Sequence, residues 1–291
     1  MDKYNDIYTY IDPLKSKICF FKLISNKYFN TKNEIHFGCA KKYEEDAQCN
    51  GSFQSDRYEG AIAVLRRENP KLKKFKRIYN DIYEIYDGDR VILKRKSSLY
   101  LPIYCFYCAD ASDSRKIDLS REGNKGIVTY HLEPDSKIFD DFKESGQSLL
   151  LYIFNPTFFY QKMKKELSKL GKCGRLLSYD ISYYTMDENG EWICPQYKHF
   201  DPKTHYYELL YKRIQFEYQK ERRFVYIDDT VSEKDYKWTI FNMPELTDDG
   251  YATIDSDIYI KINQPIYITN EQDYQELSEN IALFNQGIIK T

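Results

Sequence analysis

Short β-prone segments are spread over the whole chain of 291 residues, and they outnumber the segments that look helical. They do not alternate regularly with helices, as the strands of a doubly wound parallel sheet would. Two of them, at residues 78–86 and 90–95, flank the turn sequence at 87–89, Asp-Gly-Asp, which is typical of a β-hairpin. The pattern therefore predicts an α+β fold with mostly antiparallel pairing and a few peripheral helices.

The remaining elements are predicted from apolar and aromatic runs, turn residues and helix caps. We expect further strands at residues 17–24, 34–38, 99–108, 126–132, 148–154, 176–184, 222–228, 258–262 and 266–268. We expect helices at about 156–170, 204–215 and 271–285, and loops at 39–60, 109–126 and 185–203. No stretch rich in Pro, Gly and Ser forces a boundary, so we expect one domain over residues 1–291.

The bulk composition bounds the class of protein. Hydrophobic residues make up 42% and charged residues 30%, as in soluble globular proteins. The polar N-terminus lacks the pattern of a signal peptide, and no apolar run approaches the roughly 20 residues that span a bilayer. Seven cysteines without a secretion signal are expected to be free thiols. These features predict a cytoplasmic protein that does not contact a membrane.

The common catalytic and metal-binding motifs do not occur in the sequence. A single CxxC, Cys105 to Cys108, lies in an apolar strand without the second pair that a zinc site needs, so we interpret both thiols as packing residues. The four histidines show no HExxH pairing, and no P-loop, dinucleotide-binding or nucleophile-elbow sequence is present. We therefore expect no metal.

A basic stretch at 66–77 carries seven Lys and Arg side chains and one acid. Because the net charge is only −2, any attraction to nucleic acid has to come from such a local patch. In this stretch we expect Lys73, Lys74, Lys76 and Arg77 to contact the phosphate backbone of a nucleic acid. A Lys-rich helix at 162–172 is a second basic surface of this kind. The 29 tyrosines could form a surface on which bases stack, although an AT-rich coding sequence also explains them. A solvated face is the alternative for both basic stretches.

Residues 216–226 carry the sharpest functional signal. A charged, helix-like run turns there into a strand-like run, and Gln219 and Glu221 lie two apart at the junction. In an extended chain this spacing places both side chains on one face, where they could hold a ribose or activate a nucleophile. The alternative is an amphipathic strand start in which Arg222 and Arg223 pair with acids.

A second short segment, residues 55–60, places Asp56, Arg57 and Glu59 in one loop. Arg57 could hold a diphosphate, because a guanidinium is a planar fork of donors. A salt-bridged surface turn is the alternative.

The chain resembles an uncharacterised bacterial family that is often found near phage-defence genes. The resemblance covers residues 18 to 228. The matching features are the Phe-Gly at 37–38, the loop at 56–60, a strand that ends near Cys105, and the C-terminal pattern of Lys212, Phe216, Tyr218, Glu221 and Arg223.

The Gln-x-Glu at 219–221, just before a strand, is also similar to the motif of ADP-ribosyltransferases of the Arg–Ser–Glu class. By that resemblance the fold is ADP-ribosyltransferase-like and NAD is the substrate. Glu221 stabilises the ribosyl oxocarbenium ion, Gln219 positions the acceptor, and Arg57 and Tyr104 bind NAD. Leaving nicotinamide requires a carboxylate, a stacking aromatic ring and a phosphate clamp, but no metal.

Three functions follow as hypotheses. The first is a bacterial toxin or phage-defence effector that moves ADP-ribose from NAD to a protein or nucleic-acid acceptor, with a neutralising antitoxin or partner protein as a possible companion. The second is a nucleic-acid-binding or nuclease-like effector that uses the basic stretches. The third is a non-enzymatic sensor or interaction protein with a tyrosine-rich surface.

Overall fold

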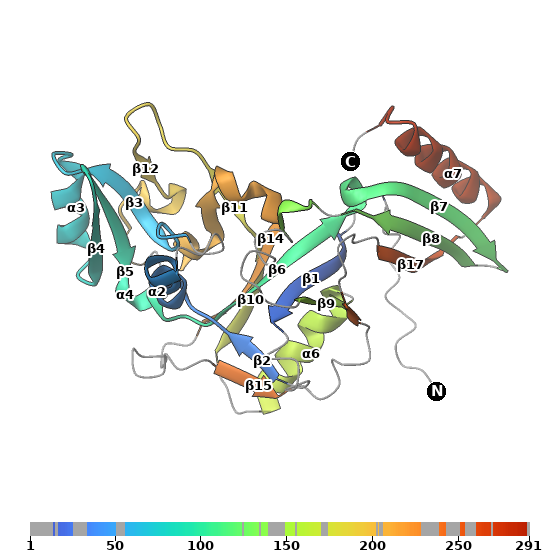
Figure 1. The fold of residues 1–291 in the computed structure, drawn as a ribbon, viewed down its shortest axis with the longest axis horizontal. Coiled ribbons are helices and arrows are strands. Elements are labelled where there is room, and N and C mark those ends of the chain that lie inside the picture. The colour runs from blue at the N-terminus through green and yellow to red at the C-terminus, as the bar shows by residue number, and fades with distance from the viewer. Residues whose placement is uncertain are drawn as a thin grey trace.

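A six-stranded sheet forms the middle of the molecule in the computed structural model (Figure 1). Its order is β10-β14-β6-β1-β9-β16, and every neighbouring pair is antiparallel, which confirms the predicted α+β class with mostly antiparallel pairing. The strands are β1 (Lys17–Ser25), β6 (Ile103–Asp110), β9 (Leu149–Phe154), β10 (Arg175–Asp180), β14 (Glu221–Ile227) and β16 (Tyr251–Thr253). The structure describes residues 14, 17–25, 34–50, 56–123, 125–133, 135–138, 149–154, 156–169, 174–201, 203, 206–227, 239–242, 251–253, 260–268 and 270–289.

Helix α6 (Pro156–Lys169) covers one face of this sheet, where a helix was predicted. Met163 and Leu167 are four residues apart, so they lie on the same side of the helix. Both are buried in one hydrophobic cluster with Phe106 and Phe224 of the sheet. The other face of the sheet is therefore left to the elements that form the candidate site.

A lobe at one end of the molecule, which we call the α3 lobe, is built on the four-stranded sheet β12-β3-β5-β4 (Figure 1). The predicted hairpin is confirmed, and its turn contains Gly88 at a φ of 60°, a backbone region that favours glycine. Helix α3 buries Leu72 and Phe75 against this sheet and leaves its basic side chains outside. The elements of the lobe are β3 (Ala61–Arg66), α3 (Lys71–Ile78), β4 (Ile82–Asp87), β5 (Arg90–Arg95) and β12 (Trp192–Ile193).

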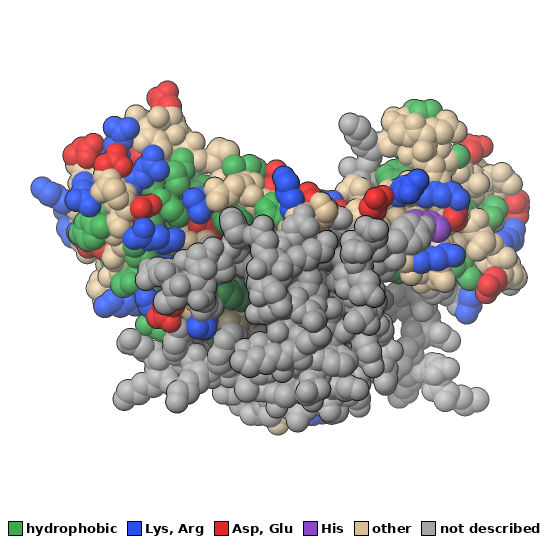
Figure 2. Space-filling view, in the orientation of Figure 1, with side chains coloured by type: hydrophobic (Ala, Val, Ile, Leu, Met, Phe, Trp, Pro, Cys, Tyr) green, Lys and Arg blue, Asp and Glu red, His purple; other side chains and the backbone are tan. Residues whose placement is uncertain are grey.

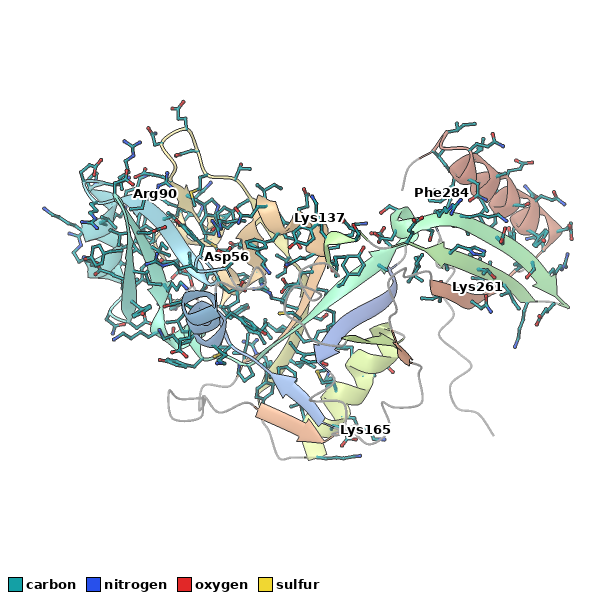
Figure 3. The ribbon with its side chains drawn as sticks, in the orientation of Figure 1. Asp56, Arg90, Lys137, Lys165, Lys261 and Phe284 are labelled. Atoms are coloured by element: carbon teal, nitrogen blue, oxygen red, sulfur yellow. The ribbon has the colours of Figure 1, made fainter. Side chains whose placement is uncertain are left out.

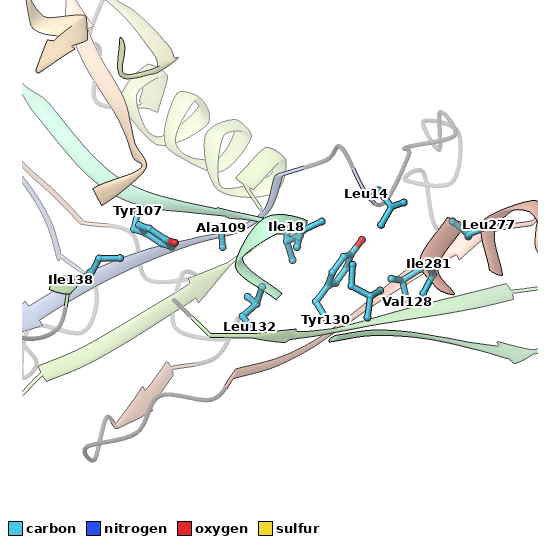
Figure 4. Packing of buried hydrophobic residues seen from close by; sticks show 12 residues of the cluster. Leu14, Ile18, Tyr107, Ala109, Val128, Tyr130, Leu132, Ile138, Leu277 and Ile281 are labelled. Atoms are coloured by element: carbon cyan, nitrogen blue, oxygen red, sulfur yellow. The ribbon is translucent and has the colours of Figure 1, made fainter. Parts of the chain in front are cut away.

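An arm at the opposite end combines the antiparallel sheet β17-β8-β7 with helix α7 (Figure 1). Val128, Tyr130 and Leu132 of the sheet pack with Leu277 and Ile281 of the helix, and the same cluster continues into the central sheet (Figure 4). The predicted C-terminal helix is confirmed. The elements of the arm are β7 (Ser114–Glu122), β8 (Lys125–Leu132), β17 (Ile260–Tyr267) and α7 (Glu271–Asn285).

Short elements connect these three parts. Strand β2 pairs with β15, and β13 pairs with β11 in the one parallel pair among the described strands. Their bounds, with those of the short helices, are β2 (Glu34–Phe37), α2 (Ala40–Asn50), α4 (Lys96–Leu99), η1 (Ala111–Asp113), β11 (Ser182–Tyr184), η2 (Pro195–Tyr197), η3 (Tyr207–Leu210), β13 (Tyr211–Arg213), η4 (Ile214–Gln219) and β15 (Thr239–Asn242).

The loop predicted at 39–60 is wrong over its first half, because α2 occupies Ala40–Asn50. Its Ala, Lys and Glu residues are strong helix formers. The buried side of this helix carries Glu44, which is fully buried, so no apolar stripe marks the helix in the sequence. The loop predicted at 109–126 is also wrong, since η1, β7 and the start of β8 lie there. Strand β7 carries only two apolar residues, Ile117 and Leu119, so its alternating pattern is too short to stand out in the sequence.

The helix predicted at 204–215 is replaced by η3, β13 and the start of η4. Tyr206 has a φ of 60°, a left-handed conformation that an α-helix does not admit. The strand predicted at 176–184 is divided at Ile181 into β10 and β11. The two strands predicted around Pro265 form the single strand β17, where an edge position tolerates proline.

Helices are short throughout the described part of the chain. The longest among them are α6 with 14 residues and α7 with 15. No described helix has both the length and the apolar character needed to cross a membrane. A single domain over residues 1–291 stays a prediction.

Candidate functional site

The two segments that the sequence analysis singled out lie against each other. Glu59, in the loop before β3, forms an ion pair with Arg223 of β14. Asp56 of the same loop forms an ion pair with Arg213 of β13, whose Nη2 lies 2.7 Å from Oδ1 of Asp56. Figure 3 places Asp56 at the inner side of the α3 lobe, facing the central strands. The candidate site is therefore built where the α3 lobe meets the central sheet.

Glu221 is the first residue of β14, and its side chain is only 6% exposed. Its Oε2 accepts from Nζ of Lys212 at 3.0 Å, and its Oε1 accepts from Nε of Arg223. Burial alone would raise the pKa of Glu221, but the charges of Arg223 and Lys212 outweigh burial and hold this pKa well below its ordinary value. Glu221 is therefore an anion at every physiological pH.

Gln219 lies beside Glu221, but strand periodicity is not the reason. Gln219 ends η4, and Lys220 follows at a φ of 37°, so the two residues are not part of one extended segment. Lys212 joins them instead: its Nζ donates to Oε1 of Gln219 at 2.6 Å as well as to Glu221. The predicted proximity is correct, whereas the predicted extended geometry is wrong.

Arg223 is the centre of the charged group, with an exposed fraction of 1%. Its guanidinium lies between Glu59 and Glu221 and donates to the carbonyl oxygen of Leu209 at 2.6 Å. Oε1 of Glu59 lies against this guanidinium without making a hydrogen bond to a described residue. Burial raises the pKa of Glu59, against the opposing effect of Arg223. The pKa values of Glu59 and Glu221, which share Arg223, are therefore shifted in opposite directions: up for Glu59 and down for Glu221.

A second buried ion pair extends the group towards the α3 lobe. Nζ of Lys94 on β5 lies 2.9 Å from Oε2 of Glu44 on α2, and both side chains are fully buried. The pKa of Lys94 lies below its ordinary value, because the effect of burial outweighs the opposing effect of the carboxylates of Glu44, Glu59 and Asp56. Lys94 and Arg223 are therefore both under the influence of the Glu59 carboxylate. We call the whole set of four acids and four bases the ionic core: Glu44, Asp56, Glu59, Glu221, Lys94, Lys212, Arg213 and Arg223.

Tyrosine and cysteine side chains line the ionic core. The hydroxyl of Tyr183 accepts from the backbone N–H of Glu221 at 2.8 Å. Cys105 lies on the strand next to β14, directly opposite Arg223, and its Sγ is 3.9 Å from the hydroxyl of Tyr43. Cys108 is three residues further along β6 and is buried on the other face of the sheet. The two thiols of the CxxC therefore point apart and do not form one site.

The two residues expected to bind NAD do not join Glu221. Arg57 turns outwards, where Nη1 lies 3.1 Å from Oδ1 of Asp87 and Nη2 donates to the carbonyl oxygen of Tyr86 at 2.9 Å. Tyr104 pairs with Phe224, so its ring lies on the α6 side of the sheet, opposite to Arg223 and Glu221. The structure thus brings Gln219 to Glu221 and places Arg57 and Tyr104 elsewhere.

The four basic residues expected to contact nucleic acid are on the exposed side of α3. Nζ of Lys76 lies 2.8 Å from Oε1 of Glu84, and Nζ of Lys74 lies 3.8 Å from the ring centroid of Phe200. Lys73 and Arg77 form no ion pair with any residue that the structure describes. Figure 2 shows Lys and Arg side chains spread over the outside of this lobe.

The second basic surface is α6. Lys164 and Lys165 are exposed on it, and Lys165 is at the end of the helix remote from the ionic core (Figure 3). Nζ of Lys169 lies 2.5 Å from Oε1 of Glu166. Within the described residues, no group of three or more His, Cys, Asp or Glu side chains is arranged to hold a metal ion.

Most of the ionic core was missed by reading the sequence. The sequence predicts a loop at Asp56 and Glu59, with a salt-bridged surface turn as one reading, and a strand at Lys94, but not the buried ion pairs that these residues form. The available signal was a charge inside an apolar strand: Lys94 follows the run at 91–93, Val-Ile-Leu, and Arg223 precedes the run at 224–227, Phe-Val-Tyr-Ile. A charged residue in a run that is otherwise buried needs a buried partner of opposite charge.

No protein-family model matches this chain, and neither a curated protein nor a solved structure is similar to it.

Proposed function

We propose that this chain is an ADP-ribosyltransferase-like effector, of the toxin or phage-defence kind, that moves ADP-ribose from NAD to a protein or nucleic-acid acceptor. One observation carries the proposal. Glu221 is a carboxylate held ionised at the start of a central strand, with Gln219 fixed beside it through Lys212.

The reaction needs that kind of carboxylate. The bond between ribose C1′ and the nicotinamide nitrogen breaks, and nicotinamide leaves with the electron pair. Positive charge develops on the ribosyl ring, and the Glu221 anion stabilises it. The acceptor nucleophile then forms a bond to C1′ and loses its proton to solvent. Gln219, as an amide beside the carboxylate, positions the acceptor.

Lys212 is the residue that controls access to Glu221. Its ammonium occupies the Oε2 side of the carboxylate and is itself only 5% exposed. Gln219 is partly exposed and accepts from the same Nζ at 2.6 Å. Binding of the ribose must therefore displace Lys212 from Glu221, while Arg223 keeps the carboxylate ionised and oriented. The closed Lys212–Glu221 pair is the resting state of the site.

The test is release of nicotinamide from NAD by the purified chain, with protein or RNA from cell extract as acceptor. Glu221→Gln should lower the rate by about 10²- to 10³-fold, the usual effect of removing one group that stabilises transition-state charge. Glu59→Gln is the matched structural control, because Glu59 is also buried and also shares Arg223. Glu217→Gln, an exposed change in η4, is the surface control.

Thermal unfolding of each variant separates chemistry from folding. If Glu59→Gln lowers nicotinamide release as much as Glu221→Gln at equal folded fraction, the ionic core is a structural element and Glu221 has no part in the reaction. If the unaltered protein releases no nicotinamide with any acceptor, the transferase function is wrong.

A nucleic-acid-binding effector is the second candidate function, and the exposed basic face of α3 favours it. Lys73 and Arg77 project from a helix whose apolar side is buried, and they have no carboxylate partner among the described residues. Reversing both charges (Lys73→Glu with Arg77→Glu) should weaken retention of double-stranded DNA or RNA and lower its salt dependence by about two phosphate contacts. Lys164→Glu with Lys165→Glu on α6 is the control with the same charge change. Equal effects of the two pairs would mean that α3 is only a solvated face.

A further inference from the structure

Three tyrosines lie together at β10, which is an edge strand of the central sheet among the described strands. The rings of Tyr206 and Tyr207 are stacked, with centroids 4.6 Å apart and an interplanar angle of 25°. Tyr179, on the edge strand β10, is 37% exposed. Tyr179 shares a face of β10 with Leu177, which packs in the same cluster as Tyr206 and Tyr207. Burial, Tyr207 and Tyr179 together raise the pKa of Tyr206 to about 12. We call Tyr179, Tyr206 and Tyr207 the tyrosine ledge.

The ledge is held by the fold. Tyr206 has a φ of 60° and a ψ of −19°, which is unfavourable for a bulky residue, and its N–H donates to Oγ of Ser98 at 3.2 Å. Both stacked tyrosines pack against the buried cluster that contains Leu209 and Val225. The rings are therefore positioned before any ligand arrives, which lowers the entropic cost of stacking on them.

A cation lies beside the ledge. Arg175 is two alternations from Tyr179 along β10, so both side chains point to the same face of the strand. Arg175 is exposed, contributes to the pKa of Tyr206, and has no carboxylate partner among the residues that the structure describes. Aromatic faces next to an unpaired arginine match a base and its phosphate.

We propose that the tyrosine ledge and Arg175 bind single-stranded nucleic acid, with bases stacked on the tyrosines and a phosphate at Arg175. Among the described strands, the ledge lies at the sheet edge formed by β10 and Tyr179 is exposed there, whereas sites for free nucleotides are concave and enclose most of the ligand. A duplex keeps its bases paired and stacked inside, so only a single strand offers free base faces. This inference is independent of the transferase function, because neither NAD nor Glu221 takes part.

Binding is measured by fluorescence anisotropy of a labelled oligoadenylate RNA of about ten nucleotides. Tyr179→Ala and Tyr207→Ala should each weaken binding about fivefold or more, since stacking on an aromatic ring is worth at least that factor per base. Tyr179→Phe keeps the ring and should keep the affinity. Arg175→Glu should weaken binding and lower the salt dependence by at least one phosphate contact. Tyr274→Ala on α7, another partly exposed tyrosine next to an arginine, is the matched control.

Three results would overturn the proposal. The first is an affinity that is unchanged in both Tyr179→Ala and Tyr207→Ala, including the case in which the RNA does not bind at all. The second is equal binding of a duplex of the same length, which would assign the interaction to charge alone. The third is displacement of the RNA by AMP at the same nucleotide concentration, which would make the ledge a mononucleotide site. Failure of the NAD assay would leave all three comparisons unaffected.

Discussion

Replacing Arg223 by methionine is the sharpest test of the ionic core. Methionine keeps much of the volume of the side chain and removes its charge. Glu221 then retains Lys212 at 3.0 Å, but Glu59 loses its one ion-pair partner among the described residues. The carbonyl oxygen of Leu209 also loses the donor that lies 2.6 Å away.

The expected cost is large because all of these groups are buried. Removing one partner of a buried ion pair destabilises a protein by about 3–5 kcal/mol, since it leaves an uncompensated charge. Adding Glu59→Gln to Arg223→Met removes that charge. The double variant should therefore recover about 1–3 kcal/mol, the usual penalty of an unsatisfied buried polar group.

Urea unfolding measures both effects, as the shift in midpoint multiplied by the slope m. Arg222→Met is the control from the same strand. Arg222 points to the other face and pairs with Asp180 at 3.0 Å, with side chains 25% and 52% exposed, so its loss should cost about 0–1 kcal/mol. If Arg223→Met costs no more than Arg222→Met, or if Glu59→Gln makes the Arg223 variant less stable still, the ionic core does not carry the stability assigned to it.

Three further predictions concern other parts of the fold. The hydrogen bonds from Ser97 and Arg95 overcome burial and lower the pKa of Asp81, so Asp81 stabilises the fold above its unfolded pKa of about 4 and loses this effect as the pH falls. Asp81→Asn should lower the free energy of unfolding by about 1–3 kcal/mol at pH 7. The urea midpoints of the variant and of the unaltered protein should converge near pH 2. A difference between the two midpoints that stays constant with pH would refute this prediction. Gly60 and Gly88 both have positive φ, but a Cβ at Gly60 meets Cβ of Ala40 at 3.3 Å and one at Gly88 meets nothing, so Gly60→Ala should lower the melting temperature more than Gly88→Ala. Burial raises the pKa of Cys39 to about 11, so peptide mapping should find it alkylated far more slowly at pH 7 in the native protein than in urea.

Local sequence patterns predicted the strands and helices that bury an apolar face. Helix α6 shows this well, because Met163 and Leu167 repeat at helical spacing and both are buried. The hairpin around Gly88 was equally predictable from its turn residues. Helix α2 was not, because a charged residue, Glu44, lies on its buried side and pairs with Lys94 from a strand some fifty residues later. A polar core leaves no hydrophobic periodicity for a local reading to detect.

The candidate site was predictable only in part, for the same reason. Gln219 and Glu221 stood out because they are close in sequence. Lys212, which joins them, and Glu59, which shares Arg223 with Glu221, come from other segments and could be placed only by the tertiary structure. Tyr104 was misplaced with respect to Glu221 because the register of β6 against β14 decides which face each residue occupies, and a shift of one residue reverses it.

Two residues with positive φ explain why the elements observed between residues 204 and 228 differ from the predicted helix and strand. Tyr206 and Lys220 interrupt what the sequence presents as a helix followed directly by a strand. Neither is a glycine or an asparagine, so composition gives no warning of a left-handed turn. Tertiary hydrogen bonds hold both backbones: the N–H of Tyr206 donates to Oγ of Ser98, and the carbonyl oxygen of Lys220 accepts from the N–H of Cys108 at 2.9 Å.

Transfer of label from NAD tests the central claim most directly. The purified chain is incubated with total cell extract and NAD labelled in a phosphate, and acid-insoluble label is counted separately in protein and in nucleic acid. We expect label in one of these fractions with the unaltered chain and with Glu217→Gln, and none above background with Glu221→Gln. Label that stays in the acid-soluble fraction with the unaltered chain, or that is transferred equally by Glu221→Gln, would contradict the assignment of Glu221 as the carboxylate of an ADP-ribosyl transfer.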